Sequence, residues 1–262
     1  MSRPDPSEVM AVVARRGDVL RALADGGERK CELDEKLDVS RSTIDRAVRE
    51  LEGLGLVARD DDGYYRTLSG SLALDEYSRF RSRMGGVLNA RGVLSPLPSD
   101  ADVDPAVVED AEIVVADRHS PLRPARHQIE LVERATHVRA VASAVLPQHV
   151  DAYYEGIVDR GMSAEIVLST PVMERVVADH DDKFHDSLQT GRVDLRQLDR
   201  DLPYSLMVAS TPDGPAMGML VYVQEGIKGF VGNDDPEAVA WARARLDDYW
   251  ADASLVPIPA EE

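Results

Sequence analysis

The stretch VSRSTIDRAVRELEGLGLV, residues 39–57, has the pattern of an amphipathic helix with a serine cap at its start. Apolar residues recur every three or four positions and would form one buried stripe, at Ile44, Val48, Leu51 and Leu54. The opposite face would present short polar and basic side chains, at Ser42, Asp45, Arg46 and Arg49, with Arg41 and Thr43 in the first turn. Such a helix is either an ordinary surface helix or one whose polar face reads DNA.

The segments on either side favour the second interpretation. Residues 6–26 predict a first helix capped at Ser7 and stopped at Gly26, and residues 28–38 predict a short second helix. Residues 56–69 predict two short strands joined by a tight turn at Asp62 and Gly63. Helix, helix, turn, helix and hairpin is the element order of a winged helix-turn-helix.

Residues 42–57, STIDRAVRELEGLGLV, closely resemble the recognition helix and first wing strand of winged-helix transcription regulators. The resemblance implies binding to double-stranded DNA, because a helix fits the major groove while a neighbouring hairpin touches the backbone. The residues of this helix that we expect to contact DNA are Arg41, Ser42, Thr43, Asp45, Arg46 and Arg49. Residues 60–62 at the wing tip are all acidic, so we assign the wing contact to Arg59 or Arg66.

Residues 69–94 predict a long helix with an apolar stripe suited to pairing, at Ala73, Tyr77, Phe80, Met84 and Val87. Major-groove readers usually bind as two-fold dimers, so we expect a homodimer paired through this helix, unless the helix packs on its own domain or the C-terminal domain pairs instead. Prolines and a run of aspartates near residue 100 mark a boundary. The expected domains are a DNA-binding domain (1–69), a linker and dimerisation helix (70–98) and an effector-sensing domain (99–262).

Strand and helix patterns alternate in the third of these segments, which predicts an α/β domain with a partly parallel sheet. The expected class of the whole chain is therefore mixed, α+β in the head and α/β in the rest. Ligands of parallel α/β sheets lie beyond the carboxyl ends of the strands. The residues expected at those ends, which we assign to a small-molecule effector, are Ser143, Ser169, Thr170, Asp199, Arg200 and Tyr204.

Four segments of this domain resemble archaeal regulators that join a winged helix to a methanogenesis-regulator middle domain: VRAVASAVLP, DRGMSAEIVLS, GRVDLRQLDRDLPYSLMV and GFVGNDDPEAVAWARARLDDYW. Their order also looks like the phospholipase-D-like effector half of TrmB-like regulators, which implies small effectors that alter promoter occupancy. The strand that would carry a His-x-Lys pair for phosphodiester chemistry reads PYSLMV instead. The resemblance therefore implies a non-catalytic, sensing domain.

Composition limits the partners. The chain of 262 residues has a net charge of −18, but residues 1–94 carry only −1 and residues 95–262 carry −17, so any DNA contact belongs to the first part. Asp outnumbers Glu and Lys is rare, a bias that resembles proteins of salt-loving archaea. The lone cysteine, Cys31, fits a small semi-buried side chain in a reducing compartment, and no apolar run predicts a membrane span or a signal peptide. We expect a cytoplasmic protein.

Other chemistry finds little support in the pattern. His180 and His185 point away from each other on a helix; His185 and Asp181 could chelate, but a solvated acidic helix face is the stronger interpretation. We expect no metal site, no cofactor and no catalytic residue. The predicted function is a sequence-specific transcription regulator whose promoter occupancy responds to a small-molecule effector. The alternative is a small-molecule enzyme, hydrolase-like in its α/β domain, with a winged helix used only for assembly.

Overall fold

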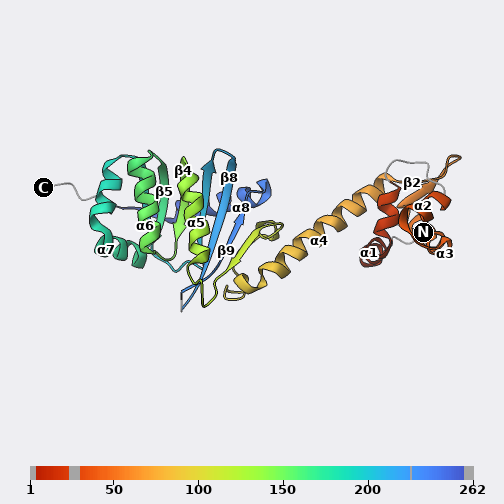
Figure 1. Ribbon diagram of the computed structural model, residues 1–262, viewed down its shortest axis with the longest axis horizontal. Helices are drawn as coiled ribbons and strands as arrows, with labels where there is room; N and C mark the ends of the chain where they lie inside the picture. Colours follow the sequence, from red (N-terminus) through yellow and green to blue (C-terminus); the bar gives the residue numbers. More distant parts are fainter. Residues whose placement is uncertain (1–3, 24–29, 225, 257–262) are drawn as a thin grey trace. The chain divides into compact units, whose positions relative to one another are not determined.

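The computed structural model describes residues 4–23, 30–224 and 226–256 of the chain. It divides into two compact units, residues 1–82 and 83–262, and the division falls inside the 27-residue helix α4 (Leu68–Leu94). Figure 1 labels the helices and strands in chain order. Within the described residues, no helix is both long enough and apolar enough to cross a membrane.

The described part of the first unit contains helices followed by an antiparallel hairpin: α1 (Pro6–Ala22), α2 (Lys30–Leu37), α3 (Arg41–Gly53), β1 (Val57–Arg59) and β2 (Tyr64–Arg66). This is the predicted element order. The predicted cap of α1 at Ser7 is wrong, because the Asp5 side chain accepts from the backbone N–H of Ser7 at 3.0 Å and Pro6 occupies the first helical position, where its fixed φ is favourable. The predicted stop at Gly26 lies outside the described residues.

The core of the first unit is one face of α3 packed against α1 and α2. Ile44, Val48 and Leu51 are fully buried and Leu54 is partly buried, which confirms the predicted stripe. Burial of each aliphatic side chain stabilises the fold by about 1.5–3 kcal/mol, so this stripe fixes the rotation of α3 about its own axis. The side chain of Cys31 lies outside what the structure describes.

The second unit is built on a mixed sheet whose described strands lie in the order β10–β6–β5–β4–β7–β8–β9–β3. Strands β4, β5 and β6 are parallel to one another and the remaining pairs are antiparallel, so the predicted, partly parallel sheet is confirmed. The strands are β3 (Glu112–Val115), β4 (His137–Ala142), β5 (Ser163–Ser169), β6 (Val193–Leu198), β7 (Ser205–Thr211), β8 (Gly214–Val223), β9 (Gly226–Asn233) and β10 (Ser254–Leu255).

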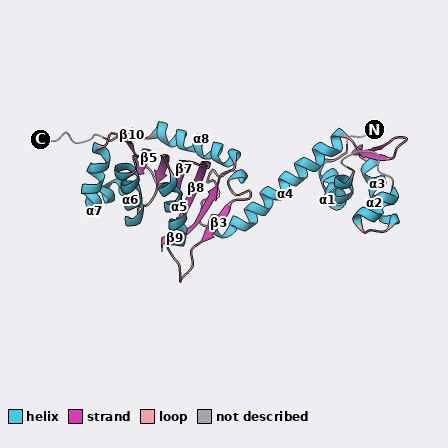
Figure 2. Ribbon diagram, turned by 45° about the horizontal axis from the view of Figure 1, so that its top comes forward, coloured by secondary structure: helices cyan, strands magenta, loops and turns pink. Residues whose placement is uncertain are grey.

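Helices cover both faces of this sheet. Helices α5, α6 and α7 lie on one face and α8 lies on the other, as Figure 2 shows. The helical segments of this unit, besides the end of α4, are η1 (Pro105–Val107), α5 (Arg123–Arg134), α6 (Pro147–Tyr154), η2 (Glu155–Asp159), α7 (Thr170–Gln189) and α8 (Pro236–Asp252). The C-terminal half of α4 packs in the core on the α8 side through Ala90 and Val93.

Two of the covering helices are irregular. Helix α6 continues directly into η2, which is a π-helical turn, and α7 is kinked at His180, whose φ and ψ are −142° and 32°. π-turns inside helices are frequent at functional sites, because they displace side chains from regular helical positions. Both irregularities lie in helices that border the cavity described below.

Candidate DNA interface and ligand cavity

Helix α3 starts at a capped turn that gathers hydroxyl groups. The backbone N–H of Thr43 donates to Ser40 Oγ at 3.3 Å, which confirms the predicted cap. The hydroxyl oxygens of Ser42 and Thr43 each lie 2.9 Å from Ser40 Oγ. The exposed N-terminus of α3 therefore presents hydroxyls beside backbone N–H groups, a combination suited to a phosphate.

The face of α3 opposite the buried stripe is exposed and rich in arginine. Arg41, Arg46 and Arg49 are exposed, and Asp45 between them is half-buried. Arg49 Nε donates to the backbone carbonyl of Asp45 at 3.1 Å, which holds the Arg49 side chain along the helix surface. The structure thus brings the predicted α3 residues together on one exposed face.

An ion pair joins α1 to α3 below this face. Arg16 donates to both carboxylate oxygens of Glu50, at 3.0 and 3.2 Å, and Arg15 lies 3.9 Å from the same carboxylate. The hydrogen bond from Arg16 holds the pKa of Glu50 below its usual value. Because Glu50 is neutralised by Arg16, it offsets little of the positive charge of Arg46 beside it.

The hairpin places its two predicted arginines differently. Arg59 is exposed on β1, with its guanidinium 5.5 Å from the centre of the Tyr64 ring. Arg66 on β2 is half-buried, and its Nη1 donates to the carbonyl of Leu20 at 3.4 Å. Of the two, the structure leaves Arg59 at the surface and directs Arg66 toward α1.

The carboxyl ends of β4, β5 and β6 lie side by side, since Ala142 pairs with Leu168 and Leu168 with Gln197. Thr170, Asp199 and Arg200 line a shallow, open depression at the β5 and β6 ends. Ser169 precedes α7 and is buried. Ser143 lies at the β4 end instead, where its backbone N–H donates to Ser205 Oγ at 2.9 Å. The structure therefore brings together only part of the predicted effector set.

Tyr204 does not belong to this set, which corrects the sequence-based assignment. Its side chain is 1% exposed, and its hydroxyl donates to the carbonyl of Asp102 at 3.0 Å. Adjacent residues of extended chain point to opposite faces. Ser205 faces the α6 side, so Tyr204 packs on the α8 side, where its ring centre lies 6.4 Å from that of Trp241. Burial raises the pKa of Tyr204.

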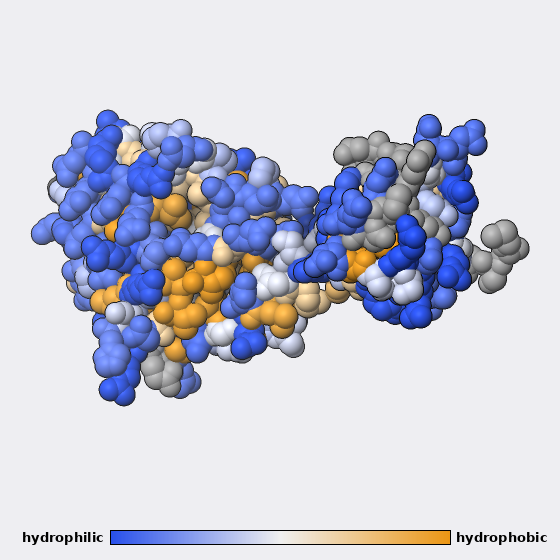
Figure 3. Space-filling view, turned by 45° about the vertical axis from the view of Figure 1, so that its right-hand side comes forward, coloured by the Kyte–Doolittle hydropathy of each residue, from blue (hydrophilic) through white to orange (hydrophobic). Residues whose placement is uncertain are grey.

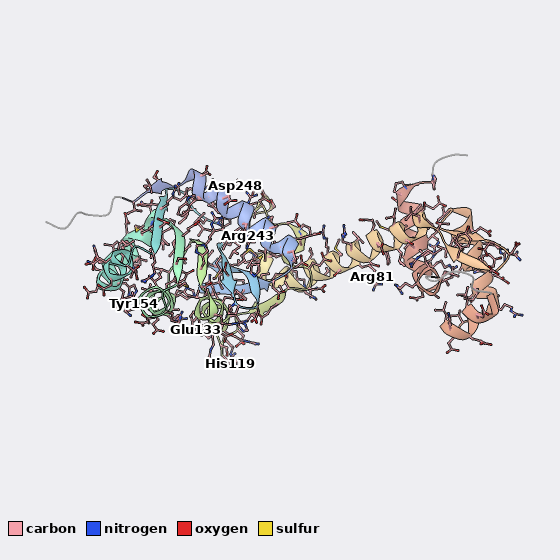
Figure 4. All side chains as sticks on the ribbon, turned by 90° about the horizontal axis from the view of Figure 1, so that it is seen from above. Arg81, His119, Glu133, Tyr154, Arg243 and Asp248 are labelled. Carbon is pink, nitrogen blue, oxygen red and sulfur yellow. The ribbon has the colours of Figure 1, made fainter. Side chains whose placement is uncertain are left out.

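A cavity of about 130 Å³ lies between α6, α7 and the strands β4 to β6. We call it the α6–α7 cavity. Its walls are mainly apolar and include Ala140, Ile157, Ile166, Leu168, Val172, Val176, Phe184 and Leu195. Tyr154, labelled in Figure 4, lines it from the end of α6, on the opposite side of the sheet from Arg243 and Asp248 of α8. The sequence analysis missed this cavity.

Polar groups line part of the same cavity: Gln128 of α5, His149 of α6, Ser205 of β7 and Tyr222 of β8. Among the described residues, neither His149 Nε2 nor Tyr222 Oη has a hydrogen-bond partner, although both atoms are buried. Burial lowers the pKa of His149 to about 4 and raises the pKa of Tyr222 to about 12, so both side chains are neutral near pH 7. The Ser205 hydroxyl is near Tyr222 but outside hydrogen-bonding geometry.

The histidines weighed for metal binding lie on α7. His185 Nδ1 is 3.1 Å from Asp181 Oδ1, one turn earlier, and His180 occupies the kink. Within the part of the chain that the structure describes, no group of three or more His, Cys, Asp or Glu side chains could hold a metal ion.

Figure 3 shows a predominantly hydrophilic surface, with hydrophobic residues gathered in a patch on the second unit.

Two family descriptions match the chain. Residues 121–252 match "Methanogenesis regulatory protein FilR1, middle domain", and residues 4–87 match "HVO_A0261 N-terminal domain". No curated protein matches the chain.

Similar solved structures include TrmBL2, described as an archaeal chromatin protein with a novel mode of DNA binding. It is 17% identical, with a TM-score of 0.44, over 96% of this chain and 100% of that one. Nuc, a phospholipase D family member from Salmonella typhimurium, is 12% identical with a TM-score of 0.41, over 57% of this chain and 99% of its own. NucT from Helicobacter pylori is 12% identical with a TM-score of 0.39, over 56% and 99%. These scores indicate distant similarity only.

Proposed function

The chain belongs to the family defined by the middle domain of methanogenesis regulatory protein FilR1, and from that premise we propose that it is a DNA-binding transcription regulator whose promoter occupancy changes when a small molecule binds. The proposal takes the first unit as a winged helix-turn-helix and the second as a sensing domain of phospholipase-D-like topology without catalysis. The asymmetry of charge, −1 over residues 1–94 against −17 over residues 95–262, assigns the DNA contact to the first part.

The exposed face of α3 carries this proposal. Its basic and hydroxyl side chains stand on a helix whose rotation is fixed by a fully buried stripe, next to a hairpin that exposes Arg59. Arg46 lies near the middle of that face and can pair with two acceptors of a guanine, while Ser42, Thr43 and the helix N-terminus suit a phosphate. Arg41, Asp45 and Arg49 complete the proposed contact face, and we no longer favour Arg66, whose side chain bonds the Leu20 carbonyl.

We propose that the regulator is a homodimer and that exposed apolar residues of α4 form the interface. The exposed large side chains on this helix are Leu68, Leu72, Phe80, Met84 and Leu88. The predicted stripe changes accordingly: Ala73 and Tyr77 pack on the core of the first unit and Val87 packs on the core of the second, which leaves Phe80 and Met84 as its exposed members. A soluble monomer rarely exposes so many large apolar side chains on one helix.

If the effector is polar, the predicted residues offer one open site for it, at the ends of β5 and β6. The depression lined by Thr170, Asp199 and Arg200 is open, and Arg200 is held there by Asp252 at 3.1 Å. Thr170 Oγ1 accepts a hydrogen bond from Gln197 Nε2 at 2.8 Å and donates one to Asp199 Oδ1 at 3.5 Å, so it can accept one further hydrogen bond. Ser143 and Ser169 lie at the ends of β4 and β5, but Ser143 bonds Ser205 and Ser169 is buried, so we assign neither a direct contact with this effector.

A gel shift with the chain's own promoter region, repeated over a range of KCl concentrations, tests the DNA-binding proposal. We expect a specific complex that a scrambled duplex does not form and that Arg46→Ala weakens. Arg126→Ala on α5, which removes an exposed arginine of the second unit, serves as the matched control and should bind normally. Absence of a complex with either duplex would favour the enzyme alternative, in which the head serves assembly only, and equal affinity for both duplexes would mean sequence-independent DNA binding.

A further inference from the structure

We propose that the α6–α7 cavity is a binding site for a compact, uncharged, mainly apolar molecule that carries a hydroxyl group. The inference deepens the proposed function, since it names the chemical class of the effector. The binding step itself does not depend on DNA. Size, wall chemistry, hydrogen-bonding capacity and charge each narrow the class of ligand.

The cavity has the size and lining of a site for one small ring. Its volume of about 130 Å³ is close to the roughly 150 Å³ of an engineered apolar cavity that binds benzene. Aliphatic and aromatic side chains from β4, β5, β6, β8, α6, η2 and α7 surround it. A ligand of this size would bury apolar surface against these walls, which is the main source of affinity in such sites.

The orphaned polar atoms specify a hydroxyl. His149 Nε2 and Tyr222 Oη are both buried without a partner among the described residues. A neutral imidazole nitrogen either accepts or donates one hydrogen bond, and a phenol hydroxyl can do both. A ligand hydroxyl also both donates and accepts, so it can pair with His149 and Tyr222 together. It would satisfy groups that cost about 1–3 kcal/mol each when buried alone.

The same site excludes charged ligands. His149 is neutral at pH 7, so it offers no counter-charge to an acid. Lys183 lines the cavity, but its Nζ lies 2.5 Å from Asp151 Oδ1, which holds the pKa of Lys183 above its usual value and satisfies its charge. An unpaired ligand charge would lose its hydration without compensation.

Both helices that cover the cavity are irregular. The kink of α7 at His180 separates Val172 and Val176 from Lys183 and Phe184, all of which line the cavity. The π-turn that follows α6 includes Ile157, another lining residue. A π-turn at the wall of the cavity fits a binding role, because such turns are frequent at functional sites.

Calorimetric titration of the full chain with phenol, benzene and benzoate tests the proposal. We expect saturable one-to-one binding of phenol, weaker binding of benzene and none of benzoate. Tyr222→Phe and His149→Phe each remove a polar atom while keeping a ring, and each should weaken phenol binding about tenfold, equivalent to one hydrogen bond, with benzene affinity unchanged. Val176→Phe, which fills the space, should abolish binding of both.

Tyr204→Phe is the matched control, because it removes a buried tyrosine hydroxyl on the opposite side of the sheet and should leave phenol binding unchanged. Absence of saturable phenol binding to the wild type would overturn the proposal, as would equal affinities in Tyr222→Phe and His149→Phe. A crystal structure with phenol present and only water in the cavity would overturn it too. Because the titration contains no DNA, the two proposals can fail separately. A failed gel shift together with saturable phenol binding would reject the proposed DNA-binding function and leave the proposed ligand site standing.

Discussion

At the scale of single residues, the face of α3 makes the most direct prediction. Arg46→Ala should lower affinity for the cognate site by about 1–3 kcal/mol and relax the base preference at one position, because a bidentate contact to a base is lost. Stability should hardly change, since Arg46 is exposed. Binding titrations with wild-type and single-base-variant duplexes, alongside circular dichroism, measure both effects. Unaltered selectivity in a folded variant would place α3 outside the interface.

His149 predicts how stability depends on pH. Burial lowers its pKa from 6.5 to about 4 in the folded chain, whereas the unfolded chain keeps the higher value. The unfolded state therefore binds more protons between these values, so stability from this group is intact above pH 6.5 and falls as the pH drops toward 4, by up to about 3 kcal/mol.

Urea unfolding followed by tryptophan fluorescence measures this effect in the second unit alone, because both tryptophans, Trp241 and Trp250, lie on α8. The free energy of unfolding of the wild type, minus that of His149→Phe, should fall steadily as the pH is lowered from 6.5 to 4. The other ionisable groups of the cavity do not titrate there: Tyr153, Tyr154, Lys183 and Tyr222. A constant difference between the two proteins would mean that His149 is solvated in solution.

At the scale of helices and strands, what could be predicted depended on how local the signal was. α3 and α8 carry their own caps and apolar periodicity, so the sequence predicts them well. Strand β9 has no comparable local signal, because Gly226, Gly229 and Gly232 lower its β-propensity. The structure supplies the reason for one of them: a Cβ on Gly229 would lie 2.5 Å from the side chain of Val93 on α4. This contact between distant segments leaves no local pattern.

The candidate sites divide in the same way. The exposed side of α3 follows from helical periodicity alone, so its residues could be named in advance. The α6–α7 cavity depends on how two irregular helices pack on three strands, and His149 gave no local signal beyond a lone histidine in HVDAYY. Tyr204 was expected beside the strand ends because it follows the β6 run in sequence, whereas its ring is buried near Trp241 of α8, a contact between distant segments.

Two neighbouring glycines of α4 make a matched pair of predictions. A Cβ added to Gly86 would lie 2.1 Å from the carbonyl oxygen of Val108, whereas nothing lies within 4 Å of a Cβ added to Gly85. Gly85→Ala should stabilise the second unit by up to about 1 kcal/mol through helix propensity. Gly86→Ala should destabilise it despite the same gain, because α4 must move away from the backbone of Val108, which follows η1. Thermal unfolding by tryptophan fluorescence compares them; equal shifts would show that α4 packs less closely than this.

The exposed residues of α4 predict the oligomeric state. Phe80, Met84 and Leu88 follow one another at four-residue spacing and so lie within roughly 80° of helix circumference. The double substitution Phe80→Asp and Leu88→Asp should yield monomers that lose most affinity for a palindromic site, since the two half-sites can no longer be held together. Sedimentation measures the mass. Tyr77→Asp is a poor substitute, because Tyr77 packs on the head core; a double variant that remained dimeric would move the interface to another surface.

For the molecule as a whole, strand β4 connects the proposed ligand cavity to the core that holds the C-terminal half of α4. Ala140 and Ala142 line the cavity, whereas Val141 between them lies in the core on the α8 side, which also contains Val93 of α4. A ligand that displaces β4 would therefore act on the core in which the C-terminal half of α4 is packed. The N-terminal half of the same helix contributes Leu74 to the core of the first unit. Coupling between such sites is typically about 1–3 kcal/mol.

The uneven charge of the molecule predicts an unusual salt dependence. If Arg41, Arg49 and Arg59 of each protomer contact phosphates, a dimer makes about six such contacts, and log Kobs should fall with log[KCl] with a slope of about −5. The net charge of −18 on each chain repels DNA at low salt, where screening is weakest, so the plot of log Kobs against log[KCl] should flatten there.

Arg59→Ala should reduce the steepness of this slope by about two, one contact for each protomer. Arg66→Ala should leave the slope unchanged while destabilising the head, since its guanidinium bonds the Leu20 carbonyl. Gel shifts over a range of KCl concentrations measure these slopes, and an effect of Arg66→Ala equal to that of Arg59→Ala would reverse their assignment.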